Sequence, residues 1–270
     1  MEASEVPFAM LTAAFDAGGD ENTPFLTVAG FVSSVGDWEE FSALWRERLK
    51  KEGIEYSRAV EAAHFRKQFQ PWHDKPDRER WRQELLADLM DLVKAHAYRK
   101  FGCSIINKRF QSIGDDLRKH YRLRAYSLAG RTCEKQVRDW ASAERIKTPI
   151  EFVFESGDEG HNELQVRLAA DSGNVPVFRP KKDTVLANGH VQRGFVPFQA
   201  ADWLAYELNA LAKFAEENKN LTMADLRWPI QEFNRILGEP GIYTEEDTDR
   251  LEHMLRLSGK IDDWAKGFGA

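Results

Sequence analysis

The segment Ile150–Glu155 constrains the fold most, because it is the clearest β-strand in the sequence. It reads Ile-Glu-Phe-Val-Phe-Glu, is rich in residues that favour strands, and stops at Ser156-Gly157. Apolar residues at helical spacing precede it over about 121–144 and follow it over 162–170. A strand set between amphipathic helices predicts an α/β domain in which helices cover a sheet.

The remaining elements follow the same alternation. Apolar runs at 7–16 and 25–33 flank a glycine turn and predict a hairpin, and runs at 98–106 and 175–178 predict two more strands. Helical spacing begins after Asp37, recurs at 76–96, begins again at Pro197, and predicts two further helices around a glycine turn within 221–257. We therefore expect a single mixed-sheet α/β domain over 1–270, with helical insertions. Its core should span about 7–215 and a helical C-terminal extension 216–270.

Composition excludes several classes of protein. No run approaches the roughly 18 apolar residues of a membrane span, and the N-terminus lacks a secretory pattern. Cys103 and Cys133 are the two cysteines of the chain, too few for a disulfide framework or a cysteine-based zinc site. We expect a cytoplasmic protein without membrane association, in which both thiols are buried.

The charge is unevenly distributed along the chain. The net charge is −6, yet residues 94–147 carry 14 Lys and Arg against 5 acids, so this stretch is +9 and the rest is −15. Such a segment is typical either of a surface that faces phosphates or of solvated helix faces. Charge alone leaves both interpretations open.

Four acids stand out by position. Asp16 closes the first strand, Glu155 closes the strongest strand with Asp158 one turn later, and Asp202 lies early in the helix that begins at Pro197. Carboxylates gathered at strand ends repel one another unless a cation neutralises them, and Mg²⁺ or Mn²⁺ prefers such oxygen ligands. Each acid taken singly also fits a structural role in a turn or a helix N-terminus. Together they predict a metal site made of these four residues.

Three motifs carry a family resemblance over about residues 10–210: Phe15-Asp16-Ala-Gly-Gly, Phe154-Glu155-Ser-Gly-Asp158 and Pro197-Phe-Gln199-Ala-Ala-Asp202-Trp-Leu-Ala-Tyr-Glu207. Together they resemble the bacterial family catalogued as domain of unknown function 3800, which is similar to RNase H-like enzymes. The resemblance implies an RNase H-like sheet. It also implies a nuclease-like site in which Asp16, Glu155 or Asp158, and Asp202 hold Mg²⁺ or Mn²⁺.

The sequence departs from the family pattern in two places. Family members often have Glu after the first Asp, where this chain has Ala17. Many also have a His-x-x-acid element, whereas here the order is Glu61-Ala-Ala-His64. Because three residues span less than one helical turn, Glu61 and His64 can still face the same metal, water or substrate.

Basic and aromatic residues supply candidates for a nucleic-acid surface. Arg179-Pro-Lys181-Lys182 lies between a strand and the last core helix and is the best local candidate for binding a phosphate backbone. Trp72 is a candidate for base stacking, although a place in the core fits it as well.

The leading hypothesis is a Mg²⁺- or Mn²⁺-dependent phosphodiesterase that acts on DNA or RNA. Asp16 would bridge the metals, Glu155 or Asp158 and Asp202 would complete the shells, and Glu61 or His64 would orient water. The alternative is a catalytically silent module that binds nucleic acid or a protein partner, which the acid missing at Ala17 favours. A third hypothesis is a metal-independent two-carboxylate hydrolase such as a glycosidase.

Overall fold

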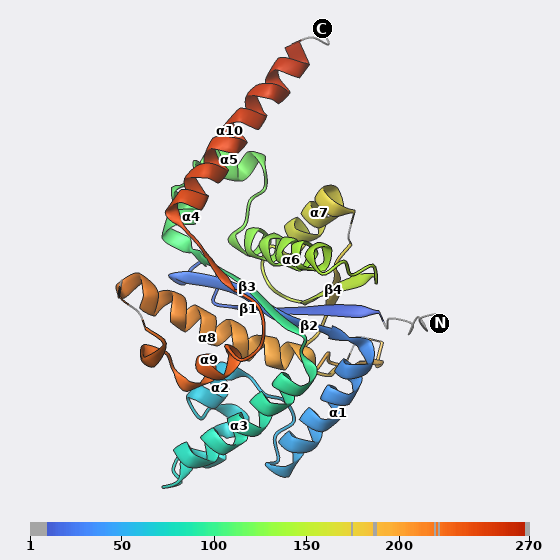
Figure 1. Ribbon diagram of the computed structural model, residues 1–270, viewed down its shortest axis with the longest axis vertical. Helices are drawn as coiled ribbons and strands as arrows, with labels where there is room; N and C mark the ends of the chain where they lie inside the picture. Colours follow the sequence, from blue (N-terminus) through green and yellow to red (C-terminus); the bar gives the residue numbers. More distant parts are fainter. Residues whose placement is uncertain (1–9, 174, 186–187, 219, 221, 268–270) are drawn as a thin grey trace, which may run out of the picture.

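The computed structural model describes residues 10–173, 175–185, 188–218, 220 and 222–267 (Figure 1). Residues 7–9 of the first expected strand and Leu221 of the expected C-terminal helices lie outside this range. The helices and strands, in chain order, are β1 (Leu11–Gly18), β2 (Phe25–Ser34), α1 (Val35–Lys51), α2 (Ala59–Ala63), the 3-10 helix η1 (Lys67–Trp72), α3 (Arg78–His96), β3 (Arg99–Ile106), α4 (Asn107–Ser112), α5 (Asp115–His120), α6 (Ala125–Ala143), β4 (Ile150–Glu155), α7 (His161–Ser172), β5 (Val177–Arg179), β6 (Thr184–Val185), β7 (Val191–Gln192), α8 (Pro197–Glu217), the 3-10 helix η2 (Met223–Asp225), α9 (Trp228–Phe233), β8 (Gly241–Tyr243) and α10 (Glu245–Gly267).

A six-stranded mixed sheet organises the chain, with strand order β5-β4-β1-β2-β3-β8. The pairs β1–β2 and β2–β3 are antiparallel, whereas β1–β4, β4–β5 and β3–β8 are parallel. Each parallel neighbour is reached through helices, as parallel pairing requires. A separate two-stranded hairpin, β6–β7, lies between β5 and α8 in the chain. The α/β fold with a mixed sheet flanked by helices is as predicted.

Helices cover both faces of the sheet (Figure 1). On one face α6 and α7 pack over a core that contains Phe15, Tyr126 and Phe154. On the other face α8 lies directly on β1 and β2, and α1, α3 and α9 pack around it to bury Trp45 and Phe233. Both cores share the central strand β2, all of whose residues are buried. A strand covered on both faces reads as a continuous apolar run, which is why the sequence signal for β2 is strong.

Small residues let α8 approach β1 closely. A Cβ atom added at Gly18 would lie 3.1 Å from the backbone of Ala205 in α8. Ala14 of β1 packs against Phe198 of the same helix. This close approach brings the first turns of α8, which contain Asp202, to the end of β1.

Three details differ from the sequence-based expectation. Helix α1 begins at Val35 rather than after Asp37, because the Ser34 hydroxyl caps it by accepting the Asp37 backbone N–H at 3.0 Å. The C-terminal extension is mainly helical as predicted, but β8 adds an edge strand to the sheet. Its α9 also inserts Ile230 and Phe233 into the main core. The described part of the C-terminal extension therefore adds to both the sheet and the core, and α10 extends away from the domain (Figure 1).

No helix among the described residues is both long enough and apolar enough to cross a membrane.

Candidate functional site

Strand register places Asp16 beside Glu155. In the parallel pair β1–β4, Ala14 lies opposite Val153 and Phe15 opposite Phe154, so the next residues, Asp16 and Glu155, are neighbours. Alternation along each strand points both side chains to the face that α8 covers, because Ala14 and Val153 pack against α8 on that face. The two carboxylates therefore meet at the carboxyl ends of two parallel strands.

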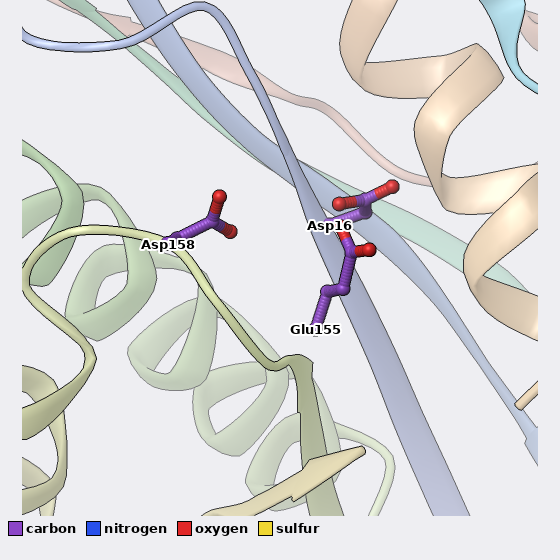
Figure 2. Close-up of side chains that lie close together, drawn as sticks. All are labelled: Asp16, Glu155 and Asp158. Atoms are coloured by element: carbon purple, nitrogen blue, oxygen red, sulfur yellow. The ribbon is translucent and has the colours of Figure 1, made fainter. Parts of the chain in front are cut away.

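Asp158 completes a group of three carboxylates. It follows β4 in the turn Gly157-Asp158, and one oxygen from each of Asp16, Glu155 and Asp158 lies within 4.8 Å of the others. Figure 2 shows the side chains of Asp16 and Glu155 close together, with Asp158 on the loop that follows β4. Asp158 Oδ2 is buried without a hydrogen-bond partner. The three oxygens are spaced as ligands of one hard cation would be.

Lys181 lies at the centre of the acids on the α8 side. Its Nζ is 2.5 Å from Asp16 Oδ2, 2.8 Å from Asp202 Oδ1 and 3.1 Å from Glu155 Oε2. The Lys181 side chain is 5% exposed. All three contacts are ion pairs, and the one with Asp202 Oδ1 is also a hydrogen bond. The structure thus brings Asp16, Glu155 and Asp202 together, as the sequence led us to expect, but around a lysine.

Asp202 also fixes a loop from a distant part of the chain. Its Oδ2 accepts the backbone N–H of Ala59 at 2.6 Å, and Arg58 Nε lies 3.9 Å from Oδ1. Both carboxylate oxygens of Asp202 are therefore engaged by the protein, and Asp202 is absent from the group formed by Asp16, Glu155 and Asp158. The four predicted metal ligands divide into that group of three and a fourth acid that pairs with Lys181.

Neighbouring residues of α8 hold the same loop. Gln199 Oε1 accepts the Ser57 backbone N–H at 2.7 Å and the Trp45 indole N–H at 2.9 Å. The Trp203 indole N–H donates to the Ser57 hydroxyl at 2.9 Å. All of these groups are buried, so each bond satisfies a donor that has no access to water. They fix residues 57–59 against the start of α8 and hence the position of Arg58.

The electrostatics of the site reflect burial and crowding. Burial, with Asp202 and Glu155 nearby, raises the pKa of Asp16 well above its ordinary value despite the opposing charge of Lys181. Burial also raises the pKa of Asp158, to about 6, and Glu155 adds to the shift. Burial alone would raise the pKa of Glu155, but the hydrogen bond with Asp16 and the charge of Lys181 outweigh burial and lower this pKa. The raised pKa values of Asp16 and Asp158 show that these buried, crowded carboxylates resist being ionised together.

A cleft of about 330 Å³ opens onto this cluster. Its walls include the basic side chains of Arg58, Lys67 and Lys182, with Lys181 and Glu155 also contributing to the lining. Lys182 is exposed, with Nζ 5.3 Å from the centre of the Tyr56 ring, another wall residue. Arg58 Nε is buried without a hydrogen-bond partner. The positive charge along the walls suits an anionic substrate, and the Glu155 carboxylate in the lining suits a cation beneath that substrate.

Two of the predicted catalytic residues lie elsewhere. Glu61 is buried in α2 and pairs with Lys67, whose Nζ is 2.9 Å from Oε1, so it reaches the cleft through that lysine. His64 is exposed and lines a different cavity, of about 510 Å³, beside Glu207 and Arg227. The structure therefore does not bring His64 into the cleft beside Glu155. His64 lies at the C-terminal end of α2, one turn beyond Glu61, where the helix has already ended.

The predicted phosphate-binding motif is divided in the same way. Lys182 lines the cleft, whereas Lys181 is buried among carboxylates and is not available to bind a phosphate on the surface. Arg179 faces another cavity, 3.5 Å from Glu151, with its guanidinium 5.3 Å from the centre of the Phe195 ring. Of the three residues, Lys182 alone keeps the predicted position.

The basic segment at 94–147 does not form a free cationic surface beside the site. None of its residues is among the described residues that line the cleft. Seven of its 14 basic side chains form ion pairs with carboxylates: Lys94, Arg109, Arg118, Arg124, Arg131, Lys135 and Arg138. Trp72 is likewise engaged, stacked 3.8 Å from Trp81 with Lys75 over its ring. Ion pairing therefore accounts for half of the basic side chains of this segment, and packing accounts for Trp72.

Sequence reasoning missed Arg58, Lys67 and the supporting role of Gln199. Gln199 lies in the motif that carries the family resemblance, and its spacing of three from Asp202 was a usable signal, because both then face the same side of α8. Arg58 and Lys67 lie in an irregular stretch around the short α2, where no periodicity marks them.

Comparisons with models of known families, with curated proteins and with solved structures found no match.

Proposed function

We propose that this protein is a metal-dependent phosphodiesterase that cleaves nucleic acid, with Mg²⁺ or Mn²⁺ held by the carboxylates at the ends of β1 and β4. The observation that carries the proposal is the group Asp16, Glu155 and Asp158, whose ligand oxygens lie within 4.8 Å of one another and whose Glu155 lines a cationic cleft. The strand order and directions support the resemblance to RNase H-like nucleases.

The residues present fit a hard divalent cation. All three candidate ligands are carboxylates, and Asp158 Oδ2 is buried without any hydrogen-bond partner. Four carboxylates face two cationic side chains, Lys181 and Arg58, which leaves a formal charge of about −2 that one divalent cation neutralises.

The roles of the side chains follow from their positions. Asp16, Glu155 and Asp158 would hold the cation, which supplies charge stabilisation at the phosphorus and an activated water when it is bound. Arg58, Lys67 and Lys182 line the cleft and would bind phosphate oxygens of the substrate backbone. Gln199 and Asp202 position Arg58 by fixing the backbone on either side of it.

A silent binding module is the second candidate, and Lys181 is the observation that favours it. Its ammonium already neutralises part of the negative charge of Asp16, Glu155 and Asp202. In such a module Lys67 and Lys182 would bind nucleic acid without cleavage.

The two cysteines bear on where the reaction takes place. Cys103 and Cys133 are both free and buried. Because thiols persist in a reducing compartment, we place the protein in the cytoplasm.

The test is cleavage of single- and double-stranded DNA and RNA in the presence of Mg²⁺ or Mn²⁺, with EDTA as the metal-free control. We expect cleavage that EDTA abolishes and that Asp16→Asn reduces by about a hundredfold. Glu159→Gln is the matched control, because Glu159 is exposed and adjoins Asp158 in sequence. If none of the four substrates is cleaved while the protein still binds one of them, the silent module replaces the enzyme.

A further inference from the structure

The Lys181 ammonium lies in a position suited to a cation. It contacts three carboxylates at 2.5, 2.8 and 3.1 Å, and its three N–H groups match these three acceptors in number. Its side chain is 5% exposed, so these contacts replace nearly all of its hydration. A buried ammonium persists only when it is paired in this way.

The backbone around Lys181 is tied down on both sides. Phe195 donates its backbone N–H to the Pro180 carbonyl at 2.9 Å, and Gly194 donates to Asp183 Oδ1 at 2.8 Å. A Cβ atom at Gly194 would lie 2.5 Å from the backbone of Lys182, so the two segments are in direct contact. Lys181 is therefore a fixed part of the site, in contrast to the exposed Lys182 beside it.

The carboxylates divide between two positions that share Asp16 and Glu155. Lys181 contacts Asp16, Glu155 and Asp202. Asp158 forms a second group with Asp16 and Glu155, and its Oδ2 has no hydrogen-bond partner. Two adjacent cation positions that share carboxylates are the arrangement of a two-metal site.

We propose that the Lys181 ammonium permanently takes the place of one of these two cations, so that Asp16, Glu155 and Asp158 hold a single divalent ion. This inference rests on the proposed function, because it assumes that the carboxylates bind a metal. Charge supports it, because one divalent ion neutralises the formal charge of about −2 that Lys181 and Arg58 leave. Lys181 is thus a positioning residue that keeps Asp202, Asp16 and Glu155 together.

The test counts Mn²⁺ ions bound per chain, by calorimetric titration and by electron paramagnetic resonance of free Mn²⁺, in the full-length protein. We expect one ion in the unmodified protein and two in Lys181→Met, because the methionine vacates the position among Asp16, Glu155 and Asp202. Lys182→Met is the matched control and should bind one ion.

The possible results separate the inference from the proposed function. Two ions in the unmodified protein, or one ion in both the unmodified protein and Lys181→Met, would overturn the inference while a metal site remains. No ion in the unmodified protein would overturn the metal-dependent function itself, and the inference with it.

A second pair of variants keeps the test decisive if Lys181→Met does not fold. Asp202→Asn should still bind one Mn²⁺ with nearly unchanged affinity, because Asp202 belongs to the lysine position. Asp158→Asn should weaken Mn²⁺ binding by about ten- to a hundredfold, because Asp158 belongs to the metal position. Equal losses in the two variants would show that the positions are not separate. Thermal melting in EDTA checks that both variants are folded.

Discussion

The carboxylate of Asp202 accepts the backbone N–H of Ala59 at 2.6 Å, although the two residues are 143 positions apart in the chain. The other oxygen of the same carboxylate lies 2.8 Å from Lys181 Nζ. One side chain therefore joins the loop before α2 to the lysine at the centre of the candidate site. The geometry of the cleft depends on this connection, since Arg58, one of its walls, immediately precedes Ala59.

The Gln199 side chain should be required for stability. In Gln199→Ala the buried N–H groups of Ser57 and Trp45 lose their acceptor, and we expect the free energy of unfolding to fall by about 2–4 kcal/mol. Urea denaturation measures the change. Gln165→Ala, at an exposed position of α7, is the matched control and should change the free energy of unfolding by less than about 0.5 kcal/mol. A loss in Gln199→Ala no larger than in the control would contradict the role given to these bonds.

Glu207 should make the protein less stable as the pH rises. Burial raises its pKa to about 7, against the opposing charges of Arg227 and Arg82. The folded state binds the Glu207 proton more tightly than the unfolded state does. The stability that this proton contributes is therefore fully present below about pH 4.5 and is lost as the pH rises through about 7.

Glu207→Gln removes this titration. We expect the variant to gain up to about 3 kcal/mol over the unmodified protein above pH 7, and little below pH 4.5. Denaturation at a series of pH values gives the difference, with Glu217→Gln, an exposed position of the same helix, as control. A difference that is constant with pH would show that Glu207 does not titrate in this range.

Nucleic-acid binding should depend on the lysines of the cleft and not on the basic segment at 94–147. In Lys67→Ala/Lys182→Ala the slope of log affinity against log salt should become shallower by up to about 2, because each phosphate contact contributes about one unit. Lys108→Ala/Lys119→Ala, at exposed positions of the basic segment, should leave the slope unchanged. Fluorescence anisotropy across a salt series provides the slopes. A larger effect from the control pair would place the interface on the basic segment instead.

The parts of the structure set by local pattern were predictable. The strands β1, β2 and β4 and the helices α3 and α8 follow apolar periodicity, and Asp16 and Glu155 were identified because they close strands. The strand β8 was not predicted, because Gly241–Tyr243 is too short for any alternation to be visible.

The burial of Lys181 depends on contacts between segments that are far apart in the chain, and these could not be predicted from local sequence patterns. Pro180-Lys181-Lys182 looks like an exposed basic turn, and whether either lysine is buried depends on where β5 lies beside β4 and how closely α8 approaches β1. Asp202 and Asp16, the acids that surround Lys181, are remote from it in sequence. His64 lies apart from the cleft for a related reason, because spacing from Glu61 predicts a shared face only while the helix continues, and α2 ends at Ala63.

The central claim is that Asp16, Glu155 and Asp158 hold a divalent cation beside Lys181. The most direct measurement is an anomalous difference map from crystals soaked in Mn²⁺. We expect one strong peak bounded by oxygens of these three carboxylates, at about 2.0–2.2 Å from each ligand atom, with the Lys181 ammonium still among Asp16, Glu155 and Asp202. Crystals soaked at a Mn²⁺ concentration that supports cleavage, yet showing no peak among these residues, would contradict the account.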